Sequence, residues 1–285
     1  MLTNFNNYSE LLTDSKLDYK RPVAFLILLF TFLSFFTLEA NGYTDCQKSS
    51  FLLLNHSLQL VPSIIWQNIT YLGNTIVLIP LLSFLCIVNP RIWASFFGSI
   101  PAAILLSHLG KKYFAIPRPA AVIDGNLINI IGDKLTAHTS LPSGHTITIF
   151  TAIFAIIFCT LGSKSRLKNG WILYLILFSI GLLVSLSRVA VGAHWPLDLI
   201  LGIAFGYLAG FSGAFLTYRY AQWWTRIVKN PYFLSSTIFI FPVTLTFQVL
   251  SGKLPQLSIV QLAVFVGSTI SIMVLTKAFS ANEKD

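Results

Sequence analysis

Charged residues are scarce in this chain of 285 residues: Asp, Glu, Lys and Arg together make up 10% of it, whereas hydrophobic residues make up 55%. A soluble domain carries roughly 25% charged residues. The shortage therefore excludes a soluble enzyme, and it leaves no stretch that is polar enough to form a separate soluble domain. We expect a single membrane domain over residues 1–285.

Metal-binding patterns are also lacking. The three cysteines, Cys46, Cys86 and Cys159, are an odd set without the spacing of a zinc site or a disulfide framework. Asp124 and Asp133 have no other carboxylates nearby in the sequence, so they do not indicate a cation site. We therefore expect neither a metal nor an organic cofactor.

Negative charge is the scarcer sign, with 10 Asp and Glu against 19 Lys and Arg. In a membrane protein such an excess commonly reflects basic cytoplasmic loops, so it does not indicate a nucleic-acid partner. The expected partners are the lipid bilayer and a membrane lipid. The sequence does not indicate an oligomeric state.

Long apolar runs between short polar segments predict an all-α fold, a transmembrane bundle with about six to eight spans. The expected spans are Pro22–Leu38, Tyr71–Val88, Ile92–Leu109, Thr146–Leu161, Trp171–Leu186, Leu197–Tyr218, Phe233–Leu250 and Leu257–Thr276. Residues 51–69 are apolar but interrupted by polar side chains. This pattern favours one or two helices that lie in the membrane interface instead of crossing it.

The basic residues predict the orientation of these spans. With the N-terminus in the cytoplasm, the larger basic set falls on the cytoplasmic side: Lys16, Lys20, Arg21, Arg91, Lys164, Arg166, Lys168, Arg219, Arg226, Lys229, Lys277 and Lys284. The outer side receives the smaller set: Lys48, Lys111, Lys112, Arg118, Lys134, Arg188 and Lys253. This distribution predicts cytoplasmic termini, with the other ends of the helices facing outward. The expected location is a bacterial inner membrane, in which those outer ends face the periplasm.

A polar group between two apolar runs, at residues 187–198, carries the strongest chemical signal. Pro196 is suited to the first position of a helix, so His194 lies just before that helix. Asp198 lies in the first turn of the helix, four residues after His194. A carboxylate on one ring nitrogen fixes the tautomer and leaves the other nitrogen free to act as a nucleophile. Arg188 supplies donors that suit a phosphoryl group.

Two further blocks supply the remaining parts of a phosphate site. Lys111 and Arg118 are cations suited to phosphate oxygens. Pro142-Ser143-Gly144-His145 opens a span, where Ser143 is a good helix N-cap and Gly144 allows close backbone approach to an anion. His145 would then lie beside that anion and could protonate a leaving oxygen.

Taken together, the three blocks resemble the signature of the type 2 phosphatidic acid phosphatase family, whose site is shared by vanadium haloperoxidases. The blocks are Lys-x6-Arg-Pro, Pro-Ser-Gly-His and Ser-Arg-x5-His-x3-Asp, in this order. The matching positions are Lys111, Arg118, Pro119, Pro142, Ser143, Gly144, His145, Ser187, Arg188, His194 and Asp198. The resemblance covers about residues 70–218, the expected catalytic core, and leaves residues 219–285 as additional C-terminal spans.

The resemblance implies a metal-independent membrane phosphatase that acts through a phosphohistidine intermediate. On this basis His194, Asp198 and His145 are the expected catalytic residues, and Lys111, Arg118, Ser143, Gly144 and Arg188 the expected phosphate ligands. Pro119, Pro142 and Ser187 would support them. His56, His108 and His138 lie outside the signature, and we do not expect them to take part.

The implied substrate is an isoprenyl pyrophosphate, phosphatidic acid, phosphatidylglycerol phosphate or lipid A, hydrolysed at the outer leaflet. A lipid phosphotransferase would use the same site, with a second lipid in place of water. An anion or lipid transporter is an alternative of another class, although transport does not need a nucleophile paired with an acid.

Overall fold

The computed structural model describes residues 23, 24, 27, 28, 31, 42–161 and 170–282, and the regular structure within them is entirely helical. The elements are α3 (Gly42–Ser57), η2 (Leu58–Leu60), α4 (Ser63–Tyr71), α5 (Thr75–Leu81), α6 (Leu85–Val88), α7 (Pro90–Phe114), α8 (Pro119–Val122), η3 (Gly125–Leu127), α9 (Gly144–Leu161), α10 (Gly170–Ala190), α11 (Pro196–Arg219), α12 (Ala221–Lys229), α13 (Pro231–Leu250) and α14 (Ser258–Asn282). The expected all-α membrane fold is confirmed.

The described part of the chain holds five helices that are long and apolar enough to cross a membrane, or six if the bent pair α4 and α5 counts as one span. Helix α9 is apolar but shorter than these. The expected span Pro22–Leu38 lies mostly outside the described residues, as does the basic loop around Arg166.

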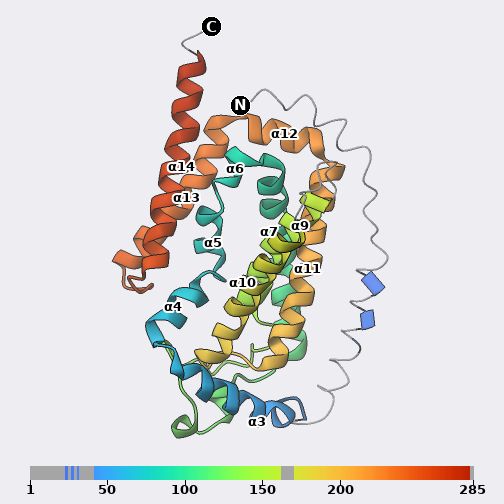
Figure 1. Cartoon of the computed structure of the whole chain (residues 1–285), viewed down its shortest axis with the longest axis vertical. Helices are drawn as coiled ribbons and strands as arrows, with labels where there is room; N and C mark the ends of the chain where they lie inside the picture. Colours follow the sequence, from blue (N-terminus) through green and yellow to red (C-terminus); the bar gives the residue numbers. More distant parts are fainter. Residues whose placement is uncertain (1–22, 25–26, 29–30, 32–41, 162–169, 283–285) are drawn as a thin grey trace.

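Helices α7, α9 and α11 form the centre of the bundle, and α10 packs on α9 (Figure 1). Small residues let α11 approach α9 closely: a Cβ atom added at Gly206 would lie 2.6 Å from the Cβ of Phe150. Gly202 and Gly210, one turn to either side, face α9 in the same way. Such spacing of glycine lets membrane helices pack through their backbones.

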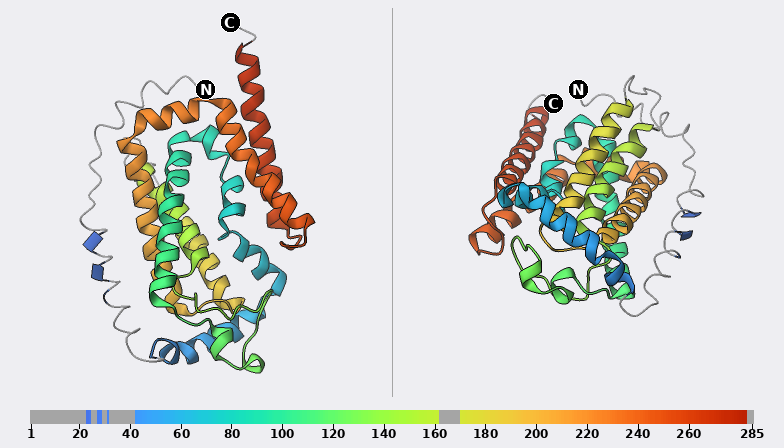
Figure 2. Two further views of the ribbon diagram at one scale, coloured as in Figure 1. Left: turned by 180° about the vertical axis from the view of Figure 1, so that it is seen from behind. Right: turned by 60° about the horizontal axis from the view of Figure 1, so that its bottom comes forward.

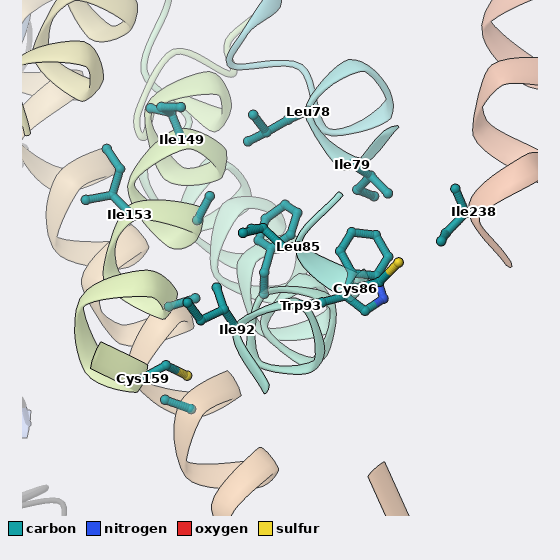
Figure 3. Packing of buried hydrophobic residues seen from close by; sticks show 14 of the residues in the cluster. Leu78, Ile79, Leu85, Cys86, Ile92, Trp93, Ile149, Ile153, Cys159 and Ile238 are labelled. Atoms are coloured by element: carbon teal, nitrogen blue, oxygen red, sulfur yellow. The ribbon is translucent and has the colours of Figure 1, made fainter. Parts of the chain in front are cut away.

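The largest buried cluster joins the central helices to the segments around them (Figure 3). Ile149 and Ile153 of α9 contribute to it, together with Leu78 of α5 and Trp93 of α7. Ile238 of α13 extends the cluster toward the C-terminal helices. Because α5, α7 and α9 share this core, the positions of their ends relative to one another are fixed by packing.

The prediction of one continuous span at Tyr71–Val88 is wrong. The chain there forms the end of α4, then α5 and α6, and α4 and α5 are bent by 74° relative to each other. Asn74 starts a new helix by accepting a hydrogen bond from the amide of Ile76, and Pro80 lacks the amide proton that would continue the α5 ladder. Gly73 permits the bend, because a Cβ atom there would lie 2.7 Å from the Cβ of His145.

Helices α13 and α14 form a hairpin that packs on the outer side of α4 and α5 (Figure 2). Gly267 of α14 faces Pro80, whose Cβ would lie 2.7 Å from a Cβ atom added at the glycine. Asn68 Oδ1 accepts a hydrogen bond of 3.0 Å from the amide of Ile259. The hairpin therefore braces the bent segment that lies against α9.

Residues 51–69, expected as interface helices, belong to α3, η2 and α4. Helix α3 lies across one end of the bundle, and α12 lies across the other end (Figures 1 and 2). Trp223 of α12 is exposed next to Arg226, as expected of an aromatic and basic helix at a membrane surface.

Candidate active site

The three motif blocks meet at the end of the bundle that α3 covers (Figure 1). Helices α7 and α10 end there, and α9 and α11 begin there. Lys111 and Arg188 consequently lie in the last turns of their helices, whereas His145 lies in a first turn. The common placement follows from the alternating direction of the central helices.

The carboxylate of Asp198 orients the imidazole of His194. Its Oδ2 atom lies 3.0 Å from Nδ1 of His194 and accepts hydrogen bonds from the Trp195 amide (2.9 Å) and the Ser140 hydroxyl (2.5 Å). Its Oδ1 atom accepts a hydrogen bond of 2.8 Å from the hydroxyl of Tyr43. The predicted contact between His194 and Asp198 is therefore present, and the carboxylate itself is held by three further donors.

Burial and charge keep the ring of His194 neutral. Its side chain is 2% exposed. Loss of hydration, followed by the positive charges of Arg118, Arg188 and Lys111, holds the pKa of His194 well below its usual value. Since Nδ1 donates its proton to Asp198, the lone pair of a neutral ring is on Nε2. This is the protonation state that a nucleophilic histidine requires.

Arg118 lies against the free nitrogen of His194. Its Nη1 atom is 3.4 Å from Nε2 of that ring and donates to the carbonyl of Ala193 at 2.9 Å. The backbone amide of Arg118 donates a hydrogen bond to the carbonyl of Ala137. The indole nitrogen of Trp195 donates to the carbonyl of Pro117, the residue before Arg118. The loop before α9 thus holds the guanidinium beside the nucleophile.

Arg188 is 7% exposed and has unused hydrogen-bonding capacity. Its Nη1 atom donates to Oγ1 of Thr70 at 2.6 Å, but its Nε is buried without a hydrogen-bond partner among the described residues. A buried charged donor without a partner is costly, and it indicates a place for an anionic ligand.

Lys111 and His145 complete the group at the N-terminus of α9. The Nζ atom of Lys111 lies 3.5 Å from the position that a Cβ atom would take at Gly144. His145, the next residue, is partly buried and interacts electrostatically with Arg188, His194 and Lys111. Free backbone amides at a helix start add further positive potential for an anion.

The other signature residues are part of the framework around this group. Ser143 is fully buried, and its Oγ atom accepts bonds from the amide (3.5 Å) and hydroxyl (3.1 Å) of Thr146, as expected of an N-cap. The Ser143 amide donates to the carbonyl of Asp198, which joins two motif blocks. Ser187 donates to the carbonyl of Val184 within α10.

The two motif prolines lie at helix starts or bends. Pro119 occupies the first turn of α8, directly after Arg118. Pro142 follows a cis peptide bond. Its ring packs on Gly110 of α7, and a Cβ atom added at Gly110 would lie 2.7 Å from that ring. Both therefore fix the backbone next to a motif residue.

Helix α3 contributes to the site in a way that was not predicted from the sequence. The hydroxyl of Tyr43 donates a hydrogen bond to Asp198, and the side-chain oxygen of Gln47 accepts one from the amide of Leu197. The side-chain amide of Asn55 donates to the carbonyls of Val189 and Asn129. These three residues and Phe51 recur every four positions and are all buried. A row at this spacing that contains Tyr, Gln and Asn is a signal of a polar face turned inward, and it could have been recognised.

Ser140 and Thr70 were also missed, although each contacts a motif residue directly. They are single small polar residues outside the motifs, so their sequence context gives no signal. Of the histidines outside the signature, His138 is exposed, and His56 bonds the carbonyl of Leu127. Within the described residues, no group of three or more His, Cys, Asp or Glu side chains is placed to hold a metal ion.

Comparison with known proteins connects this site to a family. A model of the PAP2 superfamily matches residues 92–226. The chain is 30% identical over 185 residues to an undecaprenyl-diphosphatase of Sulfolobus acidocaldarius, a match that covers 64% of this chain and 84% of that protein. It is 31% identical over 118 residues to a lipid A 1-phosphatase of Rhizobium etli, covering 40% of this chain and 46% of that protein.

A solved structure shares the fold. The crystal structure of the first transmembrane PAP2 type phosphatidylglycerolphosphate phosphatase from Bacillus subtilis superposes with a TM-score of 0.50 at 22% identity. The match covers 70% of this chain and 96% of that one. The family model matches this chain only as far as residue 226, so the α13–α14 hairpin lies outside the matched region.

The geometry predicts that Lys111 contributes to anion binding and that its neighbour Lys112 does not. Lys111 is partly buried beside the N-terminus of α9, whereas Lys112 is exposed. Loss of one charged hydrogen bond, about 1.5–3 kcal/mol, should weaken orthovanadate binding by Lys111→Gln roughly 10- to 100-fold. Lys112→Gln is the control and should bind as the unaltered protein does in isothermal titration calorimetry. Equal affinity of all three proteins would contradict this placement of Lys111.

Proposed function

The chain belongs to the PAP2 superfamily, and we propose that it uses the buried site around His194 to remove phosphate from a membrane lipid. It is an integral membrane phosphatase. The substrate class is a phosphomonoester or a diphosphate of a long-chain lipid, because the named relatives act on undecaprenyl diphosphate and on the 1-phosphate of lipid A.

One observation carries the assignment. Three cations, Lys111, Arg118 and Arg188, surround a neutral imidazole whose second nitrogen is held by a carboxylate. A binding site for an anion needs the cations, but it does not need an oriented nucleophile. Phosphoryl transfer needs both, because it depends on positioning and on neutralising the charge of the phosphoryl oxygens.

The first half of the reaction forms a phosphohistidine. Nε2 of His194 attacks phosphorus, and the bond between phosphorus and the lipid oxygen breaks. The leaving oxygen takes a proton from His145 at the start of α9, which can carry that proton once the negative charge of the bound phosphoryl group offsets the neighbouring cations. Arg118, Arg188 and Lys111 neutralise the charge on the three remaining phosphoryl oxygens.

The second half restores the enzyme. His145, now neutral, takes a proton from water as that water attacks phosphorus, and the bond from phosphorus to Nε2 breaks. Inorganic phosphate leaves and His194 is neutral again. Asp198 remains ionised throughout, and it stabilises the ring when positive charge develops on it.

Replacement of the two paired residues tests these roles. His194→Ala should abolish phosphate release from a detergent-solubilised isoprenyl diphosphate and from phosphatidic acid. Asp198→Asn should lower kcat about 10- to 100-fold, since it removes a charged hydrogen bond of about 1.5–3 kcal/mol but keeps the nucleophile.

His138→Ala is the control, because His138 is exposed in the loop before α9, and it should retain full activity. Turnover by His194→Ala would overturn the assignment of the nucleophile. Equal loss in both variants would contradict the division of roles. No release of free phosphate, together with labelled phosphate that appears on a second lipid once that lipid is added, would identify a phosphotransferase.

We also propose that the active-site end faces the periplasm and that both termini are cytoplasmic. Among the described residues, Arg91, Arg219, Lys229 and Lys277 lie at or near the helix ends opposite the site. An excess of Lys and Arg in short loops is typical of the cytoplasmic side. Three of the basic residues at the other end, Lys111, Arg118 and Arg188, are accounted for by the site.

A native cysteine tests the orientation. Cys46 of α3 is exposed at the active-site end, whereas Cys86 and Cys159 are buried. A membrane-impermeant maleimide should therefore label the unaltered protein in intact spheroplasts, and Cys46→Ser should abolish that labelling. Labelling of Cys46 only after the membrane is permeabilised would show the opposite orientation.

A further inference from the structure

A cavity of about 330 Å³ adjoins the proposed site on the side of His145. Its walls are the α4–α5 bend, one face of α7 and the first two turns of α9. It is separate from the positions of Arg118, Arg188 and His194, which do not line it. The cavity therefore begins where the leaving oxygen would receive its proton, and it extends away from the cations.

The end of the cavity near the site is polar. Ser107, His108 and Asn74 line it beside Gly144 and His145. The hydroxyl of Ser107 lies 3.4 Å from the position of a Cβ atom at Gly144, close to the ammonium of Lys111. Polar groups are thus available where the phosphate ester would be attached.

The remainder of the cavity is mostly apolar, although Thr75, Thr148 and Thr151 also line it. Phe96, Ile100, Ala103 and Ile104 contribute from α7, and they recur every three to four residues on one helix face. Ile147 of α9 faces them. From Phe96 to Ser107 this face is roughly 16 Å long, at 1.5 Å per residue. A volume of about 330 Å³ over such a length describes a narrow space.

We propose that this cavity holds the single hydrocarbon chain that is attached next to the scissile phosphate. The inference rests on the proposed function and adds the part of the substrate that the cavity selects. A narrow apolar space that starts at the proton donor fits one chain leading directly from the leaving oxygen. It does not fit the paired chains of a diacylglycerol side by side.

A second groove, of about 840 Å³, lies elsewhere on α7, and it is a poorer candidate. It is lined by Leu106, Leu109, Tyr113 and Phe205, together with Ile27 and Thr31. None of the signature residues borders it. A chain in this groove would not start at the leaving oxygen.

The test is a series of n-alkyl phosphates with increasing chain length, all used below their micelle concentrations. Each methylene buried in the cavity contributes about 0.8 kcal/mol, so kcat/KM should rise about fourfold per added carbon until the cavity is filled. Beyond that length kcat/KM should stay constant. Values that do not depend on chain length would overturn the inference.

Neighbouring residues of α7 provide matched variants. Ile104 and Leu105 are similarly exposed, at 51% and 57%, but only Ile104 lines the cavity. Ile104→Trp should narrow the cavity and end the rise in kcat/KM at a shorter chain. Leu105→Trp should leave the series unchanged. The same shift in both variants, or a shift caused by Leu109→Trp in the second groove instead, would contradict the assignment.

The outcomes separate this inference from the proposed function. Hydrolysis that depends on His194 but not on chain length would retain the phosphatase and reject the chain site. No hydrolysis of any alkyl phosphate or membrane lipid phosphate would overturn the proposed function, and the inference with it. Full activity on ethyl phosphate shows that a variant is folded, so a changed dependence on length is not a folding defect.

Discussion

The hydrogen bond between Asp198 and His194 is the interaction on which the proposed chemistry depends. It selects the tautomer with a free Nε2, and it is stable because the carboxylate is bound by Tyr43, Ser140 and the Trp195 amide as well. These donors come from α3, the loop before α9 and the start of α11. A buried carboxylate needs such donors in place of water, so one side chain joins three parts of the chain and orients the nucleophile.

The site residues were predictable because the chemistry requires particular side chains at short spacings. His194 and Asp198 are one helical turn apart, so their contact follows from the sequence alone. The meeting of Lys111, His145 and Arg188 follows from spans of alternating direction, since all three lie at helix ends on one side. Helix boundaries such as Pro196 were likewise recognisable from proline at the first helical position.

The supporting residues were not predictable in the same way, because they act through tertiary contacts. Thr70 reaches Arg188 only because α4 lies beside α10, and the apolar run at Tyr71–Val88 gives no sign of the 74° bend between α4 and α5. Packing of Gly73 against His145 and of the α13–α14 hairpin against Pro80 accounts for that bend. The hairpin lies beyond the matched part of the family model, yet it holds the segment that forms one wall of the cavity beside His145.

The most direct measurement of the central claim is the location of a trapped covalent phosphate. Rapid quenching of the enzyme with a substrate labelled with ³²P on its terminal phosphate, followed by peptide mapping, reports which residue carries the label. The account predicts an acid-labile, alkali-stable label on His194 that increases when His145 can no longer activate water. Label on another residue, or hydrolysis at full rate without any labelled protein, would contradict it.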